Sequence, residues 1–289
     1  MPLTLEPLKQ LFQITGTEAP SADDVLICEL SHYHICLAHL ADSSIHSIAY
    51  FESATPLTQS HVSSVLEKAT SHTKSFKTLL IGSAFPDYSM VPQTVADEKD
   101  LNSFLKYSGS SVQQDFVPAQ QVQLLYNIPP YFAEIFEAYP SVQTMHVHAA
   151  ALKADDLNKD GNYLYLHFTS KEFRILAIKN GEVQLAQIYP FTAPLDVVYY
   201  LLMISAQCGM PQSETVVEMS GLVDESSPSA LVIVNATSVA TIYHFTCGER
   251  AVEVGDLEVD VTDPGAVAVL AEVAELLGGM MQAHLNVEA

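Results

Sequence analysis

Two histidines near the middle of the chain have a spacing that could hold a metal ion. His146 and His148, in the run MHVHAA, would point to one face of a strand, and paired imidazoles on one face can bind zinc. The spacing implies no third ligand. We therefore favour ordinary buried or surface imidazoles over a zinc centre.

A second stretch, residues 156–167 (DLNKDGNYLYLH), is similar to a calcium loop. Asp156, Asn158 and Asp160 occupy ligand positions 1, 3 and 5 of such a loop. Position 12 requires a bidentate Glu but holds His167, and the residues that follow predict a strand instead of a helix. An Asp-Gly turn explains the segment better, so we predict no metal site in this chain.

The sequence also lacks the common signatures of nucleophilic catalysis and of phosphate loops. It contains no Ser-His-Asp order, no GxSxG elbow, no GxxxxGK[ST] loop and no GxGxxG run. The four cysteines have no CxxC spacing, and we expect buried, reduced thiols. Cys28 and Cys36 could face each other across a hairpin, which leaves a disulfide as the alternative.

The composition is strongly acidic. The chain has 34 Asp and Glu against 12 Lys and Arg, a formal charge of −22, and from Glu214 to Ala289 there are 13 acids and one base, Arg250. Such a surface repels phosphate backbones, so we predict no nucleic-acid partner. We favour a solvated, solubilising face over a docking surface for a basic partner.

The sequence predicts a cytoplasmic protein without membrane insertion. Residues 1–19 carry acids and lack the apolar core of a signal peptide. The best candidate for a membrane span, Val197–Ala206, has about ten apolar residues against a requirement of roughly twenty.

The predicted strands form an internal repeat. Residues 25–52 and 163–191 share a layout of three consecutive strands, with a register of about 138 residues that places Ser31 over Thr169 and Ile35 over Phe173. Each triplet is followed by a helix, at 57–74 and at 193–209. Two copies of this unit indicate a mixed α/β fold of two related halves with a cleft between them, where ligands commonly bind.

The remaining elements follow from periodicity and from turn residues. Residues 1–20 are predicted to be a polar lead-in, and Pro92 indicates an edge strand. Asn180-Gly181 indicates a hairpin turn, and Gly209 indicates the end of a helix. Helix 193–209 is apolar nearly all round, so we expect it to be buried. Strands are predicted at 24–31, 34–41, 45–52, 77–85, 122–128, 162–169, 172–179, 182–190, 214–221 and 241–246, and the segment 88–96 is predicted to be extended. Helices are predicted at 97–108, 129–140 and 264–285, and 142–154 is predicted as a strand that leads into a helix. The segment 229–236 is predicted as strand or helix, and a further short segment lies near 251–259.

The order of these segments resembles a known family. The run from FLKYSG through LLYNIPPYFAEIFEAYPSVQTMHVHAAAL and NYLYLHFTSKEFRILAIKNGEVQLAQIYPF to DVVYYLLMISAQCGMPQSETVVEMSG is similar to an uncharacterised bacterial family of unknown function with the actin-like ATPase fold. The resemblance implies two ribonuclease-H-like subdomains, at residues 1–153 and 154–289, the second including the C-terminal helix.

The resemblance also implies where a nucleotide would bind. Active members of the actin-like superfamily have an acid–x–Gly turn in the first hairpin of each half. The acid positions the metal ion and water, and the glycine lets backbone N–H groups approach the phosphate. The matching positions here are Glu29-Leu30-Ser31 and His167-Phe168-Thr169, so one acid remains and both glycines are missing. The adenosine turn would be at Gly221, with one glycine where two are usual.

Two functions from different classes follow. The first hypothesis is a non-catalytic actin-like scaffold or adaptor that binds an unknown protein partner and has no cofactor. The alternative is a divergent ATPase or small-molecule kinase that binds ATP and Mg²⁺ through Glu29, Ser31, Thr169 and Gly221. The terminal helix, with Met280 and Met281 near its end, is expected to pack on the core.

Overall fold

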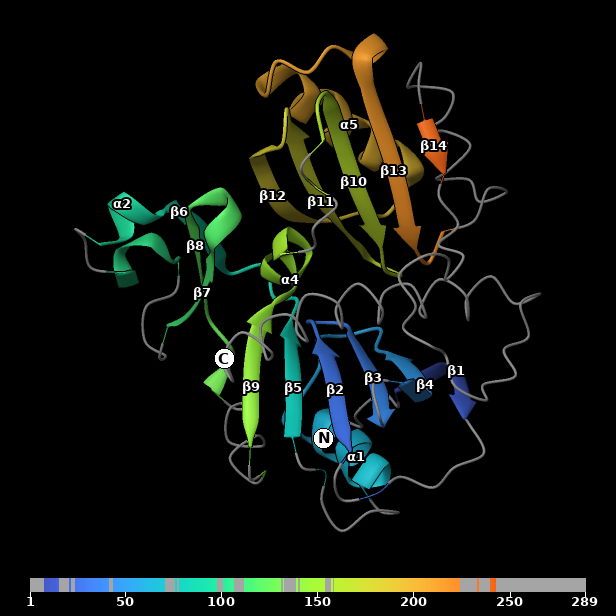
Figure 1. The fold of residues 1–289 in the computed structure, drawn as a ribbon. Helices are drawn as coiled ribbons and strands as arrows, with labels where there is room; N and C mark the ends of the chain where they lie inside the picture. Colours follow the sequence, from blue (N-terminus) through green and yellow to red (C-terminus); the bar gives the residue numbers. More distant parts are fainter. Residues whose placement is uncertain are drawn as a thin grey trace, which may run out of the picture. The chain divides into compact units, whose positions relative to one another are not determined.

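The computed structural model describes the greater part of residues 8–242 (Figure 1). Chain contacts divide it into two compact units, and within the described residues the boundary falls between Ala150 and Ala151. The described residues are 8–15, 21, 24–41, 44–70, 76, 78–97, 101–106, 112–130, 132, 139, 141–153, 157, 159–223, 233 and 240–242.

The first unit contains a six-stranded mixed sheet in the order β1-β4-β3-β2-β5-β9. The strands β1, β4, β3 and β2 pair antiparallel, whereas β2, β5 and β9 pair parallel, so three carboxyl ends meet at one edge. The central strands β2 and β3 are almost wholly buried and apolar, as expected for strands covered on both faces. The elements are β1 (Lys9–Thr15), β2 (Val25–Leu30), β3 (His34–Ala41), β4 (Ser44–Glu52), α1 (Gln59–Thr70), β5 (Thr78–Ser83), β9 (Val142–His146) and α4 (Val147–Lys153).

The expected polar lead-in at residues 1–20 is wrong over β1. KQLFQIT has too few apolar residues to be recognised as a strand from its sequence, but it pairs along nearly its whole length with β4. The backbone hydrogen bonds of an already formed sheet edge stabilise this segment, and that contribution cannot be read from its composition.

A smaller sheet is inserted into the first unit between β5 and β9. It has the order β6-β8-β7 and is antiparallel throughout. Pro92 does lie on an edge strand, as predicted. The extended segment predicted past Pro92 is wrong, because Gln93–Ala96 form the short helix α2. Of the helix predicted at 97–108, the described residues show only a 3₁₀ turn at Leu101–Phe104, and residues 98–100, 107 and 108 lie outside them. Leu105 is buried with Val91, and Leu101 and Phe104 pack partly buried against them. The elements are β6 (Tyr88–Pro92), α2 (Gln93–Ala96), the 3₁₀ turn at Leu101–Phe104, β7 (Gln113–Val117), the 3₁₀ turn at Pro118–Gln120 and β8 (Val122–Tyr126).

The second unit repeats the plan of the first. Its sheet has the order β12-β11-β10-β13-β14, which matches β4-β3-β2-β5-β9 strand for strand, with the same parallel and antiparallel pairs. The bounds of β3 and β11 (34 and 172) and of β4 and β12 (44 and 182) differ by 138 residues, which confirms the duplication. The elements are β10 (Asn162–Phe168), β11 (Glu172–Lys179), β12 (Glu182–Pro190), α5 (Pro194–Gln207), the 3₁₀ turn at Gln212–Glu214, β13 (Thr215–Gly221) and β14 (Ala240–Ile242).

Helix α5 packs one face on this sheet. Val197, Leu201 and Ile204 are buried in a core shared with β10, β11 and β13, and Gly209 ends the helix with φ +60°, as predicted. The expectation of a helix buried nearly all round is wrong, because Leu195 and Tyr199 are 68% and 63% exposed. Apolar composition alone did not distinguish a covered face from an uncovered one.

The two-residue turn predicted at Asn180-Gly181 is confirmed, with φ values of 53° and 78°. In the part of the chain that is described, no helix is both long and apolar enough to cross a membrane. Several predictions lie wholly or largely outside the described residues: the helix at 129–140, the first half of the calcium-like loop, the segments 229–236 and 251–259, and the helix at 264–285.

The start of β2 is held by a buried carboxylate. Asp24 accepts hydrogen bonds from the backbone N–H and the hydroxyl of Ser21, and its Oδ2 lies 2.6 Å from Nε2 of His39 on β3. Burial acts to raise the pKa of Asp24, but the hydrogen bonds from Ser21 and His39 outweigh it and hold the pKa below its usual value. The ionised form of Asp24 therefore stabilises the fold.

The end of β13 approaches β10 so closely that it requires glycine. Gly221 has φ +84°, and a Cβ there would lie 2.2 Å from the backbone oxygen of Phe168. Gly209 also has a positive φ, but its Cβ would meet nothing nearer than Nζ of Lys179 at 3.5 Å. A side chain is therefore excluded at Gly221 by the backbone of its neighbouring strand.

Gly221→Ala should lower the free energy of unfolding by about 3 kcal/mol or more, from the left-handed backbone and the clash with Phe168 together. Gly209→Ala, the matched control, should lose only about 1 kcal/mol. Urea denaturation of both variants measures the difference. Equal losses would contradict the close approach of the two strands.

Asp24→Asn should lower the free energy of unfolding at pH 7 by about 1–3 kcal/mol, because a charged acceptor of three hydrogen bonds is lost. A lowered native pKa means that stabilisation is complete above the unfolded value near 4 and is lost as pH falls through the native pKa. The wild-type protein should therefore lose stability more steeply below about pH 4 than the variant. Parallel acid dependences in urea titrations at several pH values would contradict this assignment.

Candidate functional site

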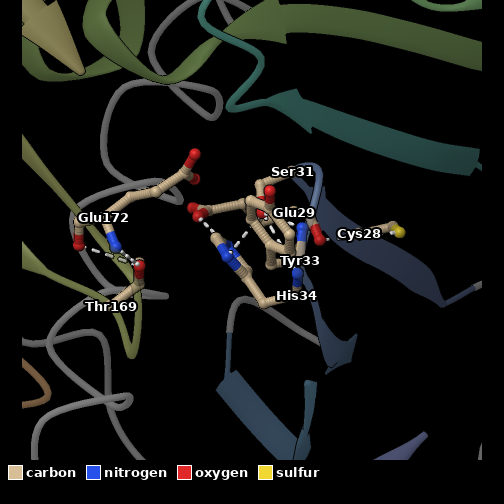
Figure 2. A network of polar contacts seen from close by, with 7 residues as sticks. All are labelled: Cys28, Glu29, Ser31, Tyr33, His34, Thr169 and Glu172. Atoms are coloured by element: carbon tan, nitrogen blue, oxygen red, sulfur yellow. Dashed lines mark hydrogen bonds and ion pairs between the residues drawn. The ribbon is translucent and has the colours of Figure 1, made fainter. Parts of the chain in front are cut away.

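The candidate site in the first unit is the turn that joins β2 to β3. Ser31, which follows β2 directly, is fully buried. Its Oγ accepts hydrogen bonds from the backbone N–H groups of Tyr33 (3.0 Å) and His34 (3.1 Å), and its own N–H donates to the carbonyl of His34. The side-chain oxygen thus closes the turn from inside (Figure 2). We call this arrangement a hydroxyl-closed turn.

The hydroxyl of Ser31 continues into a buried chain of polar contacts. Oγ lies 2.7 Å from Nδ1 of His34, and Nε2 of His34 lies 2.9 Å from Oε1 of Glu29 (Figure 2). Because Oγ already accepts two N–H groups, its proton is directed at Nδ1, and the neutral imidazole then donates its Nε2–H to Glu29. Glu29 and His34 are each only 2% exposed, so this is an internal interaction.

The residues next to this chain of contacts are mostly buried. Burial and the charge of Glu29 together raise the pKa of the neighbouring Cys28 thiol to about 12. The ring of Tyr50 stacks on that of His34 with a centroid distance of 5.4 Å. Next to the turn, His32 packs edge-on against Phe85, and burial lowers the pKa of its imidazole.

Cys28 and Cys36 do not face each other, contrary to the hairpin geometry expected. Cys28 is opposite Leu37 and Cys36 is opposite Glu29 in the register of β2 and β3. Side chains alternate between faces along a strand, so the two sulfurs lie on opposite faces of the sheet. Neither cysteine forms a disulfide, and both thiols are buried.

Glu29, His34 and Ser31 have the residue types of a catalytic triad, but the geometry gives Ser31 another role. A nucleophilic oxygen needs a lone pair directed at its substrate, whereas the Oγ of Ser31 accepts two backbone N–H groups and is inaccessible to solvent. What this group can do chemically is fix the turn and bury the hydrogen bond between His34 and Glu29. His34 was not identified as a site residue from the sequence. The signal was present, since Glu29 and His34 flank a two-residue turn that begins at a serine.

The second unit has the same turn between β10 and β11. The N–H of Thr169 donates to the carbonyl of Glu172 (2.8 Å), and the N–H of Glu172 donates to Oγ1 of Thr169 (3.2 Å) (Figure 2). The hydroxyl of Thr169 donates its proton to the carbonyl of Glu172 at 2.9 Å, whereas the hydroxyl of Ser31 donates to the imidazole of His34. The turn at Thr169 is therefore a second hydroxyl-closed turn, 138 residues after the one at Ser31.

Gly221 lies beside this second turn, at the end of β13. It pairs with Phe168, and the N–H of Leu222 donates to the carbonyl of Phe168 at 2.8 Å. The preceding residue, Ser220, has its Oγ 3.0 Å from Nδ1 of His167. The four candidate residues thus form two local pairs: Glu29 with Ser31 in the first unit, and Thr169 with Gly221 in the second.

His146 and His148 lie at the junction of β9 and α4 and are both buried. The N–H of His146 donates to Asp115 (2.6 Å), its Nε2 lies 3.2 Å from the carbonyl of Phe85, and its Nδ1 accepts the N–H of His148. These contacts assign His146 to joining β9 to the inserted sheet. Within the described ranges, no three His, Cys, Asp or Glu side chains are grouped as metal ligands would be.

Removing a closing hydroxyl should destabilise its unit. Thr169→Val keeps the shape but loses both hydrogen bonds of Oγ1, and we expect a loss of about 1–3 kcal/mol because the Glu172 N–H is left buried and unbonded. Thr169→Ser, the matched control, keeps the hydroxyl and should stay within about 1 kcal/mol of wild type. Urea denaturation tests the pair. Equal stability of the two variants would show that the hydroxyl does not hold the turn.

Comparison with solved structures identifies the fold. The chain is similar to a Bacteroides thetaiotaomicron VPI-5482 protein with an actin-like ATPase fold and unknown function, with 16% identity and a TM-score of 0.61 over 77% of this chain and 91% of that one. It is also similar to a structure of the PilM–PilN type IV pilus biogenesis complex, with 8% identity and a TM-score of 0.58 over 88% of this chain and 99% of that one. The chain therefore has the actin-like ATPase fold, as expected.

No curated protein matches the sequence. A family model does match it, over residues 26–233, which include both hydroxyl-closed turns and the parallel strands beside them. The chain belongs to the family described as "Protein of unknown function (DUF3822)".

Proposed function

We propose that this protein is a non-catalytic member of the actin-like fold that acts as a scaffold or adaptor by binding another protein. The observation that carries the proposal is the pair of hydroxyl-closed turns at Ser31 and Thr169. In active members of the superfamily these first hairpins hold phosphate. Here they are occupied by their own side chains.

Backbone N–H groups of both turns already have acceptors within their own turn. In the first turn the N–H groups of Ser31, Tyr33 and His34 all donate within the turn, at 3.0–3.1 Å. In the second the N–H groups of Thr169 and Glu172 do the same. A phosphate that approached either turn would have to displace the hydroxyl from these donors, and the side chain itself obstructs that approach.

The surroundings of Glu29 and Gly221 also do not fit the binding of Mg²⁺ and ATP. The carboxylate of Glu29 is 2.9 Å from an imidazole and 2% exposed, so a metal ion would have to break a buried pair to reach it. Gly221 is explained by the backbone of Phe168. The residues present do not fit the nucleotide, and we assign no catalytic step to them.

A protein that keeps this fold but lacks its phosphate-binding turns can still bind another protein, as a scaffold or adaptor does. One solved structure similar to this chain is of PilM with PilN, a complex in type IV pilus biogenesis. That similarity, at 8% identity, supports the proposal only by showing that the fold occurs in a complex between proteins.

Isothermal titration of the full-length protein with ATP and Mg²⁺ tests the proposal. We expect no saturable heat at nucleotide concentrations up to about 1 mM, since the N–H groups of Tyr33, His34 and Glu172 already donate to the hydroxyls of the turns. Glu29→Ala should give the same flat titration as the wild type. Saturable micromolar binding by the wild type, weakened in Glu29→Ala, would establish the alternative, a nucleotide-binding ATPase or kinase.

A further inference from the structure

Two helices of the first unit have a buried imidazole at their N-terminal ends. The N–H of Thr58, directly before α1, donates to Nδ1 of His61 at 3.3 Å, and the N–H of His61 donates to Oγ1 of Thr58 at 3.4 Å. The N–H of His148, in the first turn of α4, donates to Nδ1 of His146 at 3.2 Å. His61 and His146 are 7% and 0% exposed. Each imidazole therefore supplies an acceptor that the helix itself cannot provide.

These contacts are helix caps in which a ring nitrogen replaces the usual side-chain oxygen. Thr58 and His61 form the reciprocal pair of a capping box, in which the fourth residue is ordinarily Glu or Gln. His146 occupies the N-cap position of α4, where Ser, Thr, Asp and Asn are preferred. A backbone N–H can only donate, so Nδ1 of each ring is an unprotonated acceptor and the ring proton is on Nε2. Both caps therefore require a neutral imidazole.

Both ring nitrogens of His146 are already bonded, since Nε2 lies 3.2 Å from the carbonyl of Phe85. Asp115 on β7 attracts a proton to this ring, but its Oδ2 accepts the backbone N–H of His146, at 2.6 Å, and not a ring proton. A second proton would have to occupy Nδ1, where the N–H of His148 now donates. Protonation of His146 therefore breaks the cap of α4.

The other groups that face these two histidines leave this conclusion unchanged. Burial and the charge of Asp115 raise the pKa of Tyr126, so its phenol carries no charge near neutral pH. Beside α1, burial lowers the pKa of His32, whose carbonyl accepts the N–H of Leu57. The charged residues of α1 lie six and seven positions beyond His61 and are Glu67 and Lys68. The titratable rings packed against His146 have centroid distances of 4.2, 5.4 and 5.5 Å and belong to Tyr88 on β6, Tyr126 on β8 and His148.

The corresponding helix of the second unit is capped by a carboxylate. α1 follows β2–β4 and α5 follows β10–β12, and Asp196 is the third residue of α5 as His61 is of α1. Oδ2 of Asp196 accepts the N–H groups of Thr192 and Ala193, each at 2.9 Å, and these hydrogen bonds hold the pKa of Asp196 below its usual value. Asp196 therefore remains an acceptor at pH values at which an imidazole takes up a proton.

We propose that His61 and His146 form a pH-sensitive switch that releases the N-terminal ends of α1 and α4 in mild acid, while α5 stays capped. In the unfolded chain an imidazole takes up a proton near pH 6.5, whereas in the folded chain it must first lose its N–H partner. The unfolded state thus binds more protons, and stability falls as the pH drops below about 6.5. A protonated ring also places positive charge at the positive end of a helix. This proposal does not depend on the proposed function.

Hydrogen exchange followed by NMR in the full-length protein, between about pH 7.5 and 5.5, tests the switch. Protection factors, which correct for the intrinsic pH dependence of exchange, are measured for the amides of Thr58 and His148. We expect both to fall at least about tenfold in acid, and those of Thr192 and Ala193 to change less than about twofold. Nitrogen-15 shifts of the two imidazoles at about pH 7.5 should place the ring proton on Nε2.

Two variants keep an acceptor at the cap but cannot take up the proton. His61→Gln gives α1 an ordinary capping box, and His146→Asn places a preferred N-cap residue before α4. Protection of Thr58 in the first variant, and of His148 in the second, should change less than about twofold over the same pH range. Equal acid losses in the wild type and both variants would overturn the proposal. So would a ring proton on Nδ1 at neutral pH, which the wild-type protein alone reveals.

Discussion

The hydroxyl-closed turn is the constraint on which this account of the molecule depends. A tight strand-to-strand turn leaves backbone N–H groups that must be bonded if they are buried. Ser31 and Thr169 meet that requirement with a side-chain oxygen, and neither residue needs a left-handed backbone. A glycine turn leaves such groups to a ligand. The same two positions therefore determine both how the hairpins are stabilised and whether they can hold phosphate.

Both halves of the duplication have a hydroxyl-closed turn, but the residues around the two turns differ. Under the 138-residue register Glu29 corresponds to His167 and His34 to Glu172, so acid and imidazole are exchanged between the two turns. In the first unit the hydroxyl proton is directed to His34, and in the second to the carbonyl of Glu172. The units also differ after their parallel strands, where the first carries the inserted β6-β8-β7 sheet between β5 and β9.

Much of the fold could be predicted from the sequence because its central strands are regular. Alternation, the Asn180-Gly181 turn and the repeat located β2–β4 and β10–β12 within a residue or two. The strand β1, the short turns of the insert and the exposed face of α5 depend on partners distant in sequence, which no local pattern encodes. For the candidate site, the family resemblance located the two turns at Ser31 and Thr169 and indicated that both glycines are missing, but the hydrogen bonds of these residues and the contribution of His34 required three-dimensional geometry.

Hydrogen exchange shows whether the hydroxyls of Ser31 and Thr169 hold the backbone N–H groups of the two turns. The amides of Tyr33, His34 and Glu172 can be followed by NMR in the full-length protein, with and without ATP and Mg²⁺. We predict that all three are protected from exchange without nucleotide and that millimolar ATP, about 1 mM, changes neither their exchange rates nor their chemical shifts. Fast exchange in the free protein that becomes slow when ATP is added would show that these N–H groups are available to phosphate, and would contradict the account.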